Sequence, residues 1–337
     1  MIIKPNKIYA GTFSIPYRVP SGWRRFIYDS ENRVFEIMND LDMRPCGTLK
    51  GISGNYRISG VSFHPQKEVA AFVTEDGMTV SDFNGNRLWA YKAPVNALLF
   101  SRDGSEVWVA ENIDSKTLFV SVIETDTGIE NSANTMEDTL YESSLGLYHA
   151  PEVVLMELAA GQDGCEIWKL DDTDSAMRYQ VVFPNDCHIM PAFSTDGQRL
   201  LTLENDERLY YSYDWPEKTL ISKQRAYSEE EWADEDAMPG YSIVYLKNGL
   251  SVVQSATDRL YLFDPVKMER LMELVIEGFE PVPTNKIFPN LKDESLYSPI
   301  AMFERMGDII LAKTSKYVKN QAMLLFTEDE LIQQISC

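Results

Sequence analysis

The sequence has few residues of the types that most often carry metal sites or redox chemistry. Only three of its 337 residues are histidines and only four are cysteines. The cysteines, Cys46, Cys165, Cys187 and Cys337, are far apart and form no Cys-x-x-Cys pair. This spacing argues against a cysteine-based zinc module and against a disulfide scaffold. We therefore expect four reduced thiols in a cytoplasmic protein.

Basic residues are also scarce, at 31 against 52 acidic ones, which gives a formal charge of −21. Such a charge repels nucleic-acid phosphates and anionic lipid surfaces, so neither is expected as a partner. The stretch after Lys4 and Lys7 lacks the continuous apolar region of a secretory signal peptide. No apolar run in the sequence approaches the length of a membrane helix, which is about 18 residues. The same negative charge would attract a basic protein.

Helical periodicity is rare, whereas short runs of Val, Ile, Leu, Phe and Tyr alternate with polar turns throughout the chain. Each run-and-turn unit predicts a meander of short antiparallel strands. The clearest units cover residues 61–83, 97–122, 191–213 and 243–263. Weaker copies cover residues 147–170 and 299–326, and residues 24–37 predict a hairpin that a strand at 7–13 would precede.

Seven such units give about 48 residues each, close to the about 40–50 residues of a propeller blade. Blades bury their two faces by packing against each other. The sequence therefore predicts an all-β fold: a single β-propeller domain over residues 1–337, with about seven four-stranded blades. Six or eight blades remain as alternatives. We expect the N- and C-terminal segments to close the ring.

Three turns resemble a known repeat. Phe63-His-Pro, Phe100-Ser-Arg-Asp-Gly and Phe193-Ser-Thr-Asp-Gly are similar to the Phe-Ser-Pro-Asp-Gly turn of WD40-like propeller repeats. The units lack the Gly-His start and the Trp-Asp pair of standard WD40 repeats. The resemblance implies a divergent WD40-like propeller, and propellers of this type are mostly protein-binding platforms.

Catalytic motifs are missing from the sequence: there is no Gly-x-Ser-x-Gly elbow and no phosphate-binding glycine loop. His64 precedes a proline and is interpreted as a turn residue. His149, Cys187 and His188 form a weak candidate zinc site, although their spacing fits no standard ligand pattern. Asp258 is one of several aspartates expected to cap their own turns. We predict no catalytic residue and no cofactor.

The most distinctive segment is an acidic insertion, residues 225–240, in which six of the ten residues 228–237 are acidic and surround a tryptophan. Aromatic anchors among charges are typical of protein-binding hot spots. The predicted partner-binding residues are Glu229, Glu230, Glu231, Trp232, Asp234, Glu235 and Asp236. Residues 130–141 and 280–298 are interpreted as two further long connections.

These patterns favour a non-catalytic, monomeric protein-binding propeller with a basic protein as its partner. A narrower version is an inhibitor or immunity-type protein that covers a basic toxin or nuclease. Two alternatives stay open: a metal-dependent hydrolase or lyase with its site at the propeller channel, and a general interaction scaffold.

Overall fold

The structure, a computed structural model, describes most of the 337 residues. The described residues are 1–10, 14–19, 22–29, 34–39, 45–50, 60–140, 142–160, 164–173, 176–184, 191–204, 209–225, 239–255, 258–283, 286, 296–306, 309–315 and 321–336. They fall into two compact units: one covers Phe13–Asp186, and the other combines Met1–Thr12 with Cys187–Cys337.

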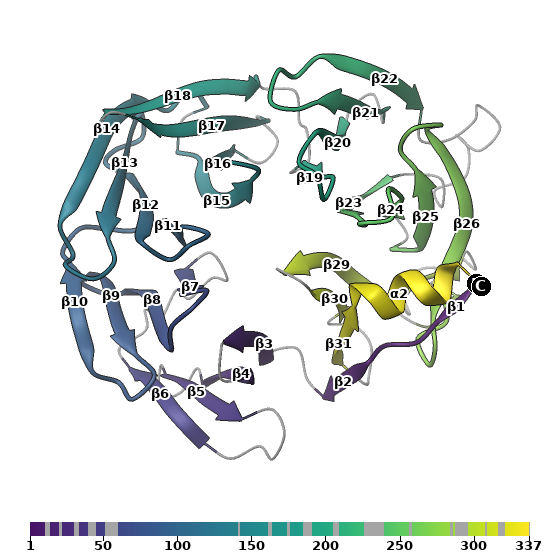
Figure 1. Ribbon diagram of the computed structural model, residues 1–337, viewed down its shortest axis with the longest axis horizontal. Helices are drawn as coiled ribbons and strands as arrows, with labels where there is room; N and C mark the ends of the chain where they lie inside the picture. The colour runs from purple at the N-terminus through teal and green to yellow at the C-terminus, as the bar shows by residue number, and fades with distance from the viewer. Residues whose placement is uncertain are drawn as a thin grey trace. The chain divides into compact units, whose positions relative to one another are not determined.

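The described residues of the unit Phe13–Asp186 form four sheets, each a meander of four consecutive antiparallel strands (Figure 1). The first two sheets consist of β3 (Ser14–Val19), β4 (Gly22–Asp29), β5 (Val34–Asn39) and β6 (Pro45–Lys50), then β7 (Val61–Phe63), β8 (Val69–Thr74), β9 (Gly77–Asp82) and β10 (Arg87–Tyr91). The next two consist of β11 (Ala97–Phe100), β12 (Glu106–Asn112), β13 (Thr117–Glu124) and β14 (Glu130–Glu137), then β15 (Ser144–Ala150), β16 (Val153–Ala159), β17 (Cys165–Thr173) and β18 (Ala176–Phe183).

Among its described residues, the second unit contains three larger sheets and helix α2 (Glu328–Ile335). Its sheets consist of β19 (Ala192–Phe193), β20 (Arg199–Glu204), β21 (Leu209–Asp214) and β22 (Leu220–Arg225); of β23 (Pro239–Tyr245), β24 (Ser251–Ser255), β25 (Leu260–Asp264), β26 (Glu269–Ile276) and β1 (Ile2–Ile3); and of β29 (Ile300–Met306), β30 (Ile309–Thr314), β31 (Ala322–Thr327) and β2 (Lys7–Ala10). A small sheet pairs β27 (Val282–Pro283) with β28 (Leu296–Tyr297), and helix α2 (Glu328–Ile335) follows β31.

The prediction of an all-β propeller built from four-stranded blades is confirmed. In the part of the chain that the structure describes, seven sheets have four or five strands. Within each unit, a cluster of buried apolar side chains lies between each pair of successive sheets, as the packing of blades requires.

The structure shows that the predictions for two segments, residues 7–13 and residues 130–141, are wrong. The strand near residues 7–13 does not precede the 24–37 hairpin: β2 pairs with β31 instead, and β3 is the first strand of the hairpin's sheet. The expected connection at residues 130–141 is largely strand β14. Its sequence looked like a loop because an outermost strand buries few side chains, here mainly Ser132 and Met136.

The turns between the first two strands of the blades explain the Asp-Gly pairs. Asp103 accepts hydrogen bonds from the Ser101 hydroxyl (2.7 Å) and the Ser105 backbone N–H (3.0 Å). Gly104 has φ +77°, and a Cβ there would lie 2.3 Å from Cε1 of His64. His64 belongs to the neighbouring blade and is only 2% exposed, and its ring packs against this turn. The Nδ1 atom of His64 accepts a hydrogen bond from the backbone N–H of Gln66 (2.9 Å). His64 therefore has the structural role expected of a turn residue.

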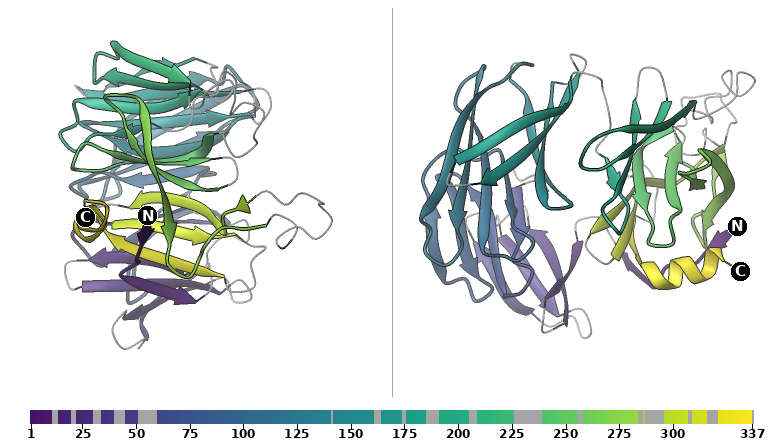
Figure 2. Two further views of the ribbon diagram at one scale, coloured as in Figure 1. Left: turned by 90° about the vertical axis from the view of Figure 1, so that its right-hand side faces the viewer. Right: turned by 45° about the horizontal axis from the view of Figure 1, so that its top comes forward.

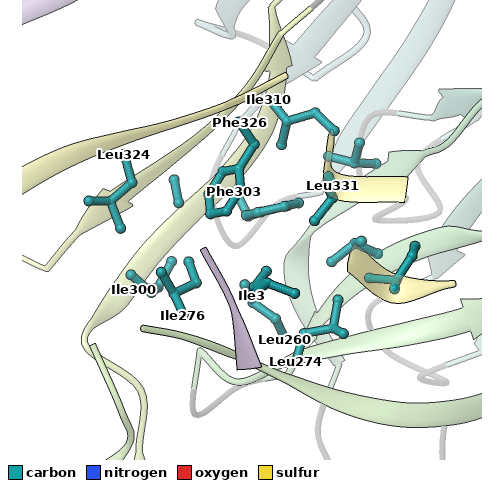
Figure 3. Close-up of a cluster of buried hydrophobic side chains, with 14 of the residues drawn as sticks. Ile3, Leu260, Leu274, Ile276, Ile300, Phe303, Ile310, Leu324, Phe326 and Leu331 are labelled. Carbon is teal, nitrogen blue, oxygen red and sulfur yellow. The ribbon is translucent and has the colours of Figure 1, made fainter. Parts of the chain in front are cut away.

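The largest buried cluster joins the two ends of the chain (Figure 3). Ile3 of β1 packs with Phe303, Phe326 and Leu331, the last of which projects from α2. The helix lies beside β1, close to both termini (Figure 2). The Gln334 side chain donates to the Lys4 carbonyl oxygen (3.0 Å) and accepts its backbone N–H (2.6 Å).

An ion pair fixes the start of α2. The Arg305 guanidinium donates to both oxygens of Glu328, at 2.6 and 3.0 Å, and to the Tyr245 carbonyl oxygen at 2.8 Å. The Lys247 backbone N–H donates to Glu328 as well (2.7 Å). Because the Glu328 side chain is buried, this network ties the helix to β23 and β29.

Candidate functional site

Most of the predicted site residues lie outside the described residues. This holds for the whole acidic partner-binding set of residues 229–236 and for two of the three candidate zinc ligands, Cys187 and His188. The roles predicted for them stay predictions.

His149, the third candidate ligand, lies near the end of β15. The residue is exposed, yet the protein around the imidazole desolvates it and, with the nearby positive charge of Arg102, lowers the pKa of His149 to about 4. A neutral imidazole can bind a metal, whereas the guanidinium beside it disfavours a cation. Among the described residues, no group of three or more His, Cys, Asp or Glu side chains is arranged to hold a metal ion.

Asp258 occupies a left-handed backbone conformation, with φ +61°, in the turn before β25. Its carboxylate accepts a hydrogen bond from the Gln254 side chain (3.1 Å), which also donates to the Ile300 carbonyl oxygen (2.9 Å). Burial raises the pKa of Asp258 to about 6, although a hydrogen bond with Tyr297 opposes the change. The residue thus carries a desolvated charge at neutral pH.

We expect Asp258→Asn to stabilise the protein by about 1–2 kcal/mol at neutral pH. Because the pKa is raised in the folded state, the protonated acid favours folding at low pH, and this contribution is lost as the pH rises through about 6. The variant should lose that pH dependence, and asparagine tolerates the left-handed backbone. The effect is measured by urea unfolding from about pH 4 to about pH 7.5, a range that includes the folded-state pKa of about 6.

Asp264 provides the matched control. Burial raises its pKa, but hydrogen bonds from the Lys267 and Val266 backbone N–H groups outweigh this, and the pKa of Asp264 is lowered overall. Asp264→Asn should therefore destabilise the protein at neutral pH. Equal effects of the two substitutions would show that the charge of Asp258 is not the cause.

The negative charge of the chain is concentrated in two neighbouring blades. Residues 97–183, which form β11–β18, contain 17 acidic and 4 basic residues, a net charge of −13 out of −21 for the whole chain. We call this region the acidic blades. Its two sheets are joined directly: the Asn112 side chain donates to the Ser143 carbonyl oxygen (2.8 Å), and the Asn134 side chain donates to that of Met177 (3.2 Å).

Much of this charge gathers where the turns β11–β12, β13–β14 and β15–β16 lie, at one end of the acidic blades, which we call the acidic end. Antiparallel succession places these turns at the same end of their sheets. Strands β11 and β12 both contact β15, so the two sheets lie against each other here. The described acidic residues of this end are Asp103, Glu106, Glu124, Asp126, Glu130, Glu152, Asp171 and Asp172.

Negative charges act across the two blades at Glu106. Burial raises the pKa of Glu106, a hydrogen bond from Asn131 (3.3 Å) opposes this, and the negative charges of Asp172 and Asp103 raise it further. Like charges held together in this way cost stability, and their repulsion is relieved when a cationic group binds. The acidic end is therefore the candidate binding site among the described residues.

The net charge of the whole chain and the acidity of one conspicuous loop do not reveal this site. A tally of charges blade by blade would have found the acidic blades. It would not have found the acidic end, because turns from two sheets come together there only through the register of the strands.

Comparisons with known proteins support the fold. No protein-family profile matches the chain, and no curated protein matches it in sequence. Among solved structures, dihydro-heme d1 dehydrogenase NirN, in complex with DHE, aligns with 98% of this chain and 74% of its own, at 16% identity and a TM-score of 0.58.

The β-propeller domain of Cps50 (Swd1) from Myceliophteria thermophila aligns with 95% of this chain and 98% of its own, at 10% identity and a TM-score of 0.58. At such identities the likeness extends to the fold alone. The chain is thus a β-propeller, and the WD40-like resemblance of its turns is consistent with that fold. In the described part of the chain, no helix is long and apolar enough to span a membrane.

Proposed function

We propose that the protein is a non-catalytic, monomeric protein-binding propeller that holds a basic protein partner at its acidic end. The observation that carries this proposal is the net charge of −13 on two neighbouring blades, where the negative charges of Asp172 and Asp103 act on Glu106. A partner rich in Lys and Arg relieves this repulsion on binding and is steered to the site over long range.

The narrower form of the proposal is an inhibitor or immunity-type protein whose partner is a basic toxin or nuclease. A strongly acidic surface would complement such a partner, and the net charge of −13 on the acidic blades supports this form of the proposal. We place the protein in the cytoplasm, because its four widely spaced cysteines form no Cys-x-x-Cys pair and are expected to be reduced thiols.

The proposal is tested by affinity capture from native cell extract with three baits. They are the wild-type chain, an acidic-end variant and a control variant with the same number and type of changes. The acidic-end variant is Asp126→Lys, Glu130→Lys and Glu152→Lys, all at exposed positions. The control variant is Asp214→Lys, Glu217→Lys and Glu269→Lys, at exposed positions of the other unit.

We expect one basic protein on the wild-type and control baits at low salt, and at least tenfold less of it on the acidic-end bait and at high salt. The control variant matters because any acidic protein retains some basic protein non-specifically. Equal retention by all three baits, or no retained protein together with near-stoichiometric metal in the purified chain, would contradict the proposal.

A further inference from the structure

The outer strand of the second acidic blade carries an aromatic side chain that the fold leaves exposed. Tyr179 of β18 is 44% exposed, and Val181, two residues further on the same face, is 37% exposed. This face is turned toward β14, because Met177 on the same face belongs to the apolar cluster between the two sheets. We call Tyr179 and Val181 the β18 flank.

The ring of Tyr179 is held in a fixed orientation. It stacks on the buried Trp168, with ring centroids 4.7 Å apart and planes inclined by 16°. The Trp168 indole N–H donates to Glu166 (2.7 Å), which also accepts the Thr139 hydroxyl (2.8 Å). An aromatic ring supported in this way loses little conformational entropy when a partner covers it.

The surroundings of the flank favour a cation. The flank lies within the acidic blades, and exposed carboxylates stand near both ends of β14, at Glu130 and Glu137. The basic Arg178 is adjacent in sequence, but alternation along the strand turns it to the opposite face, where it pairs in register with Asp171. A planar guanidinium stacks on an aromatic face better than an ammonium group does.

Resting on the proposed function, we infer that the β18 flank is part of the partner-binding surface and that Tyr179 receives an arginine side chain of the basic partner by stacking. The flank thus contributes orientation and specificity, while the acidic end contributes long-range attraction. The occupant is an arginine-bearing segment of a protein, because the negative charge of the acidic blades would repel an acidic segment.

The probe for this inference is a short fluorescent peptide of alternating Arg and Ser, with its Lys–Ser counterpart as a second ligand. Its dissociation constant is measured by anisotropy at low salt for the wild type, Tyr179→Leu, Tyr179→Phe and Tyr148→Leu. Tyr179→Leu keeps an apolar side chain but removes the ring, and Tyr179→Phe keeps the ring. Tyr148 is another exposed tyrosine of the same unit and serves as the control.

We expect Tyr179→Leu to weaken binding of the Arg–Ser peptide about five- to tenfold and that of the Lys–Ser peptide less. Tyr179→Phe and Tyr148→Leu should bind like the wild type. Wild-type affinity of Tyr179→Leu, equal weakening by Tyr148→Leu, or no binding of the peptide to the wild type would each overturn the inference. In the first two cases the acidic-end variant still tests the proposed function independently.

Discussion

Gly47→Ala is expected to destabilise the unit Phe13–Asp186 by about 3–4 kcal/mol. A Cβ at Gly47 would lie 2.0 Å from the Phe83 carbonyl oxygen, which belongs to the next blade and accepts the Thr48 backbone N–H at 3.1 Å. Backbone atoms cannot rotate aside, so the two blades must separate and this hydrogen bond must lengthen. Chemical unfolding followed by tryptophan fluorescence measures the loss.

Gly60→Ala is the control for this prediction. A Cβ at Gly60 meets only the Val73 side chain, at 3.5 Å, which is ordinary contact. Neither glycine has a left-handed backbone, so the two substitutions differ mainly in the clash. The Gly60 variant should unfold within about 0.5 kcal/mol of the wild type. Similar losses for both variants would show that the close approach of the blades at Gly47 is not what the substitution disturbs.

Glu328→Ala is expected to cost about 3 kcal/mol in the second unit. The substitution leaves the Arg305 guanidinium without its carboxylate and removes the acceptor of the Lys247 backbone N–H. Since α2 holds the N-terminal residues through Gln334 and Lys4, the backbone amides of β1 and β2 should exchange hydrogen faster as well.

Glu330→Ala separates this network from the general effect of a negative charge at a helix start. Glu330 lies in the same first turn of α2 but is exposed. Its loss should cost less than about 1 kcal/mol and leave the exchange of β1 and β2 unchanged. If both variants lose equal stability, the helix dipole and not the Arg305–Glu328 pair accounts for the effect.

The local rules of the sequence predicted the blades well. The turn Ser101–Ser105 could be predicted because an aspartate that caps its own turn and a glycine with positive φ leave a recognisable pattern. The same pattern recurs at Ser194, whose hydroxyl donates to Asp196 at 2.6 Å. Apolar alternation then located the two buried strands that follow each turn.

Pairing between distant segments could not be predicted in the same way. β2 joins β31 across more than 300 residues, and nothing in the sequence of residues 7–10 distinguishes that partner from the nearby hairpin. β14 was missed because an outer strand needs few apolar residues. Tyr179 was missed for a related reason: its exposure follows from the outer position of β18, which is a property of the assembled sheet.

For the candidate site, too, the sequence predicts the kind of partner but not the contacts between distant segments. The net charge of the whole chain predicts a basic partner, and the acidic run predicts that the partner binds at residues 229–236, which lie outside the described residues. The acidic end depends on Asp103, Glu106 and Asp172 meeting across two sheets. Their separation in sequence gives no sign of that meeting, so only the structure could identify it.

The most direct test of the account is the salt dependence of the dissociation constant for the captured partner, measured for the wild type, the acidic-end variant and the control variant. If the acidic end holds the partner, affinity falls steeply with salt for the wild type and the control, and the acidic-end variant binds weakly with a shallower slope. Equal affinities and equal slopes for all three proteins would contradict the claim that this surface binds a basic partner.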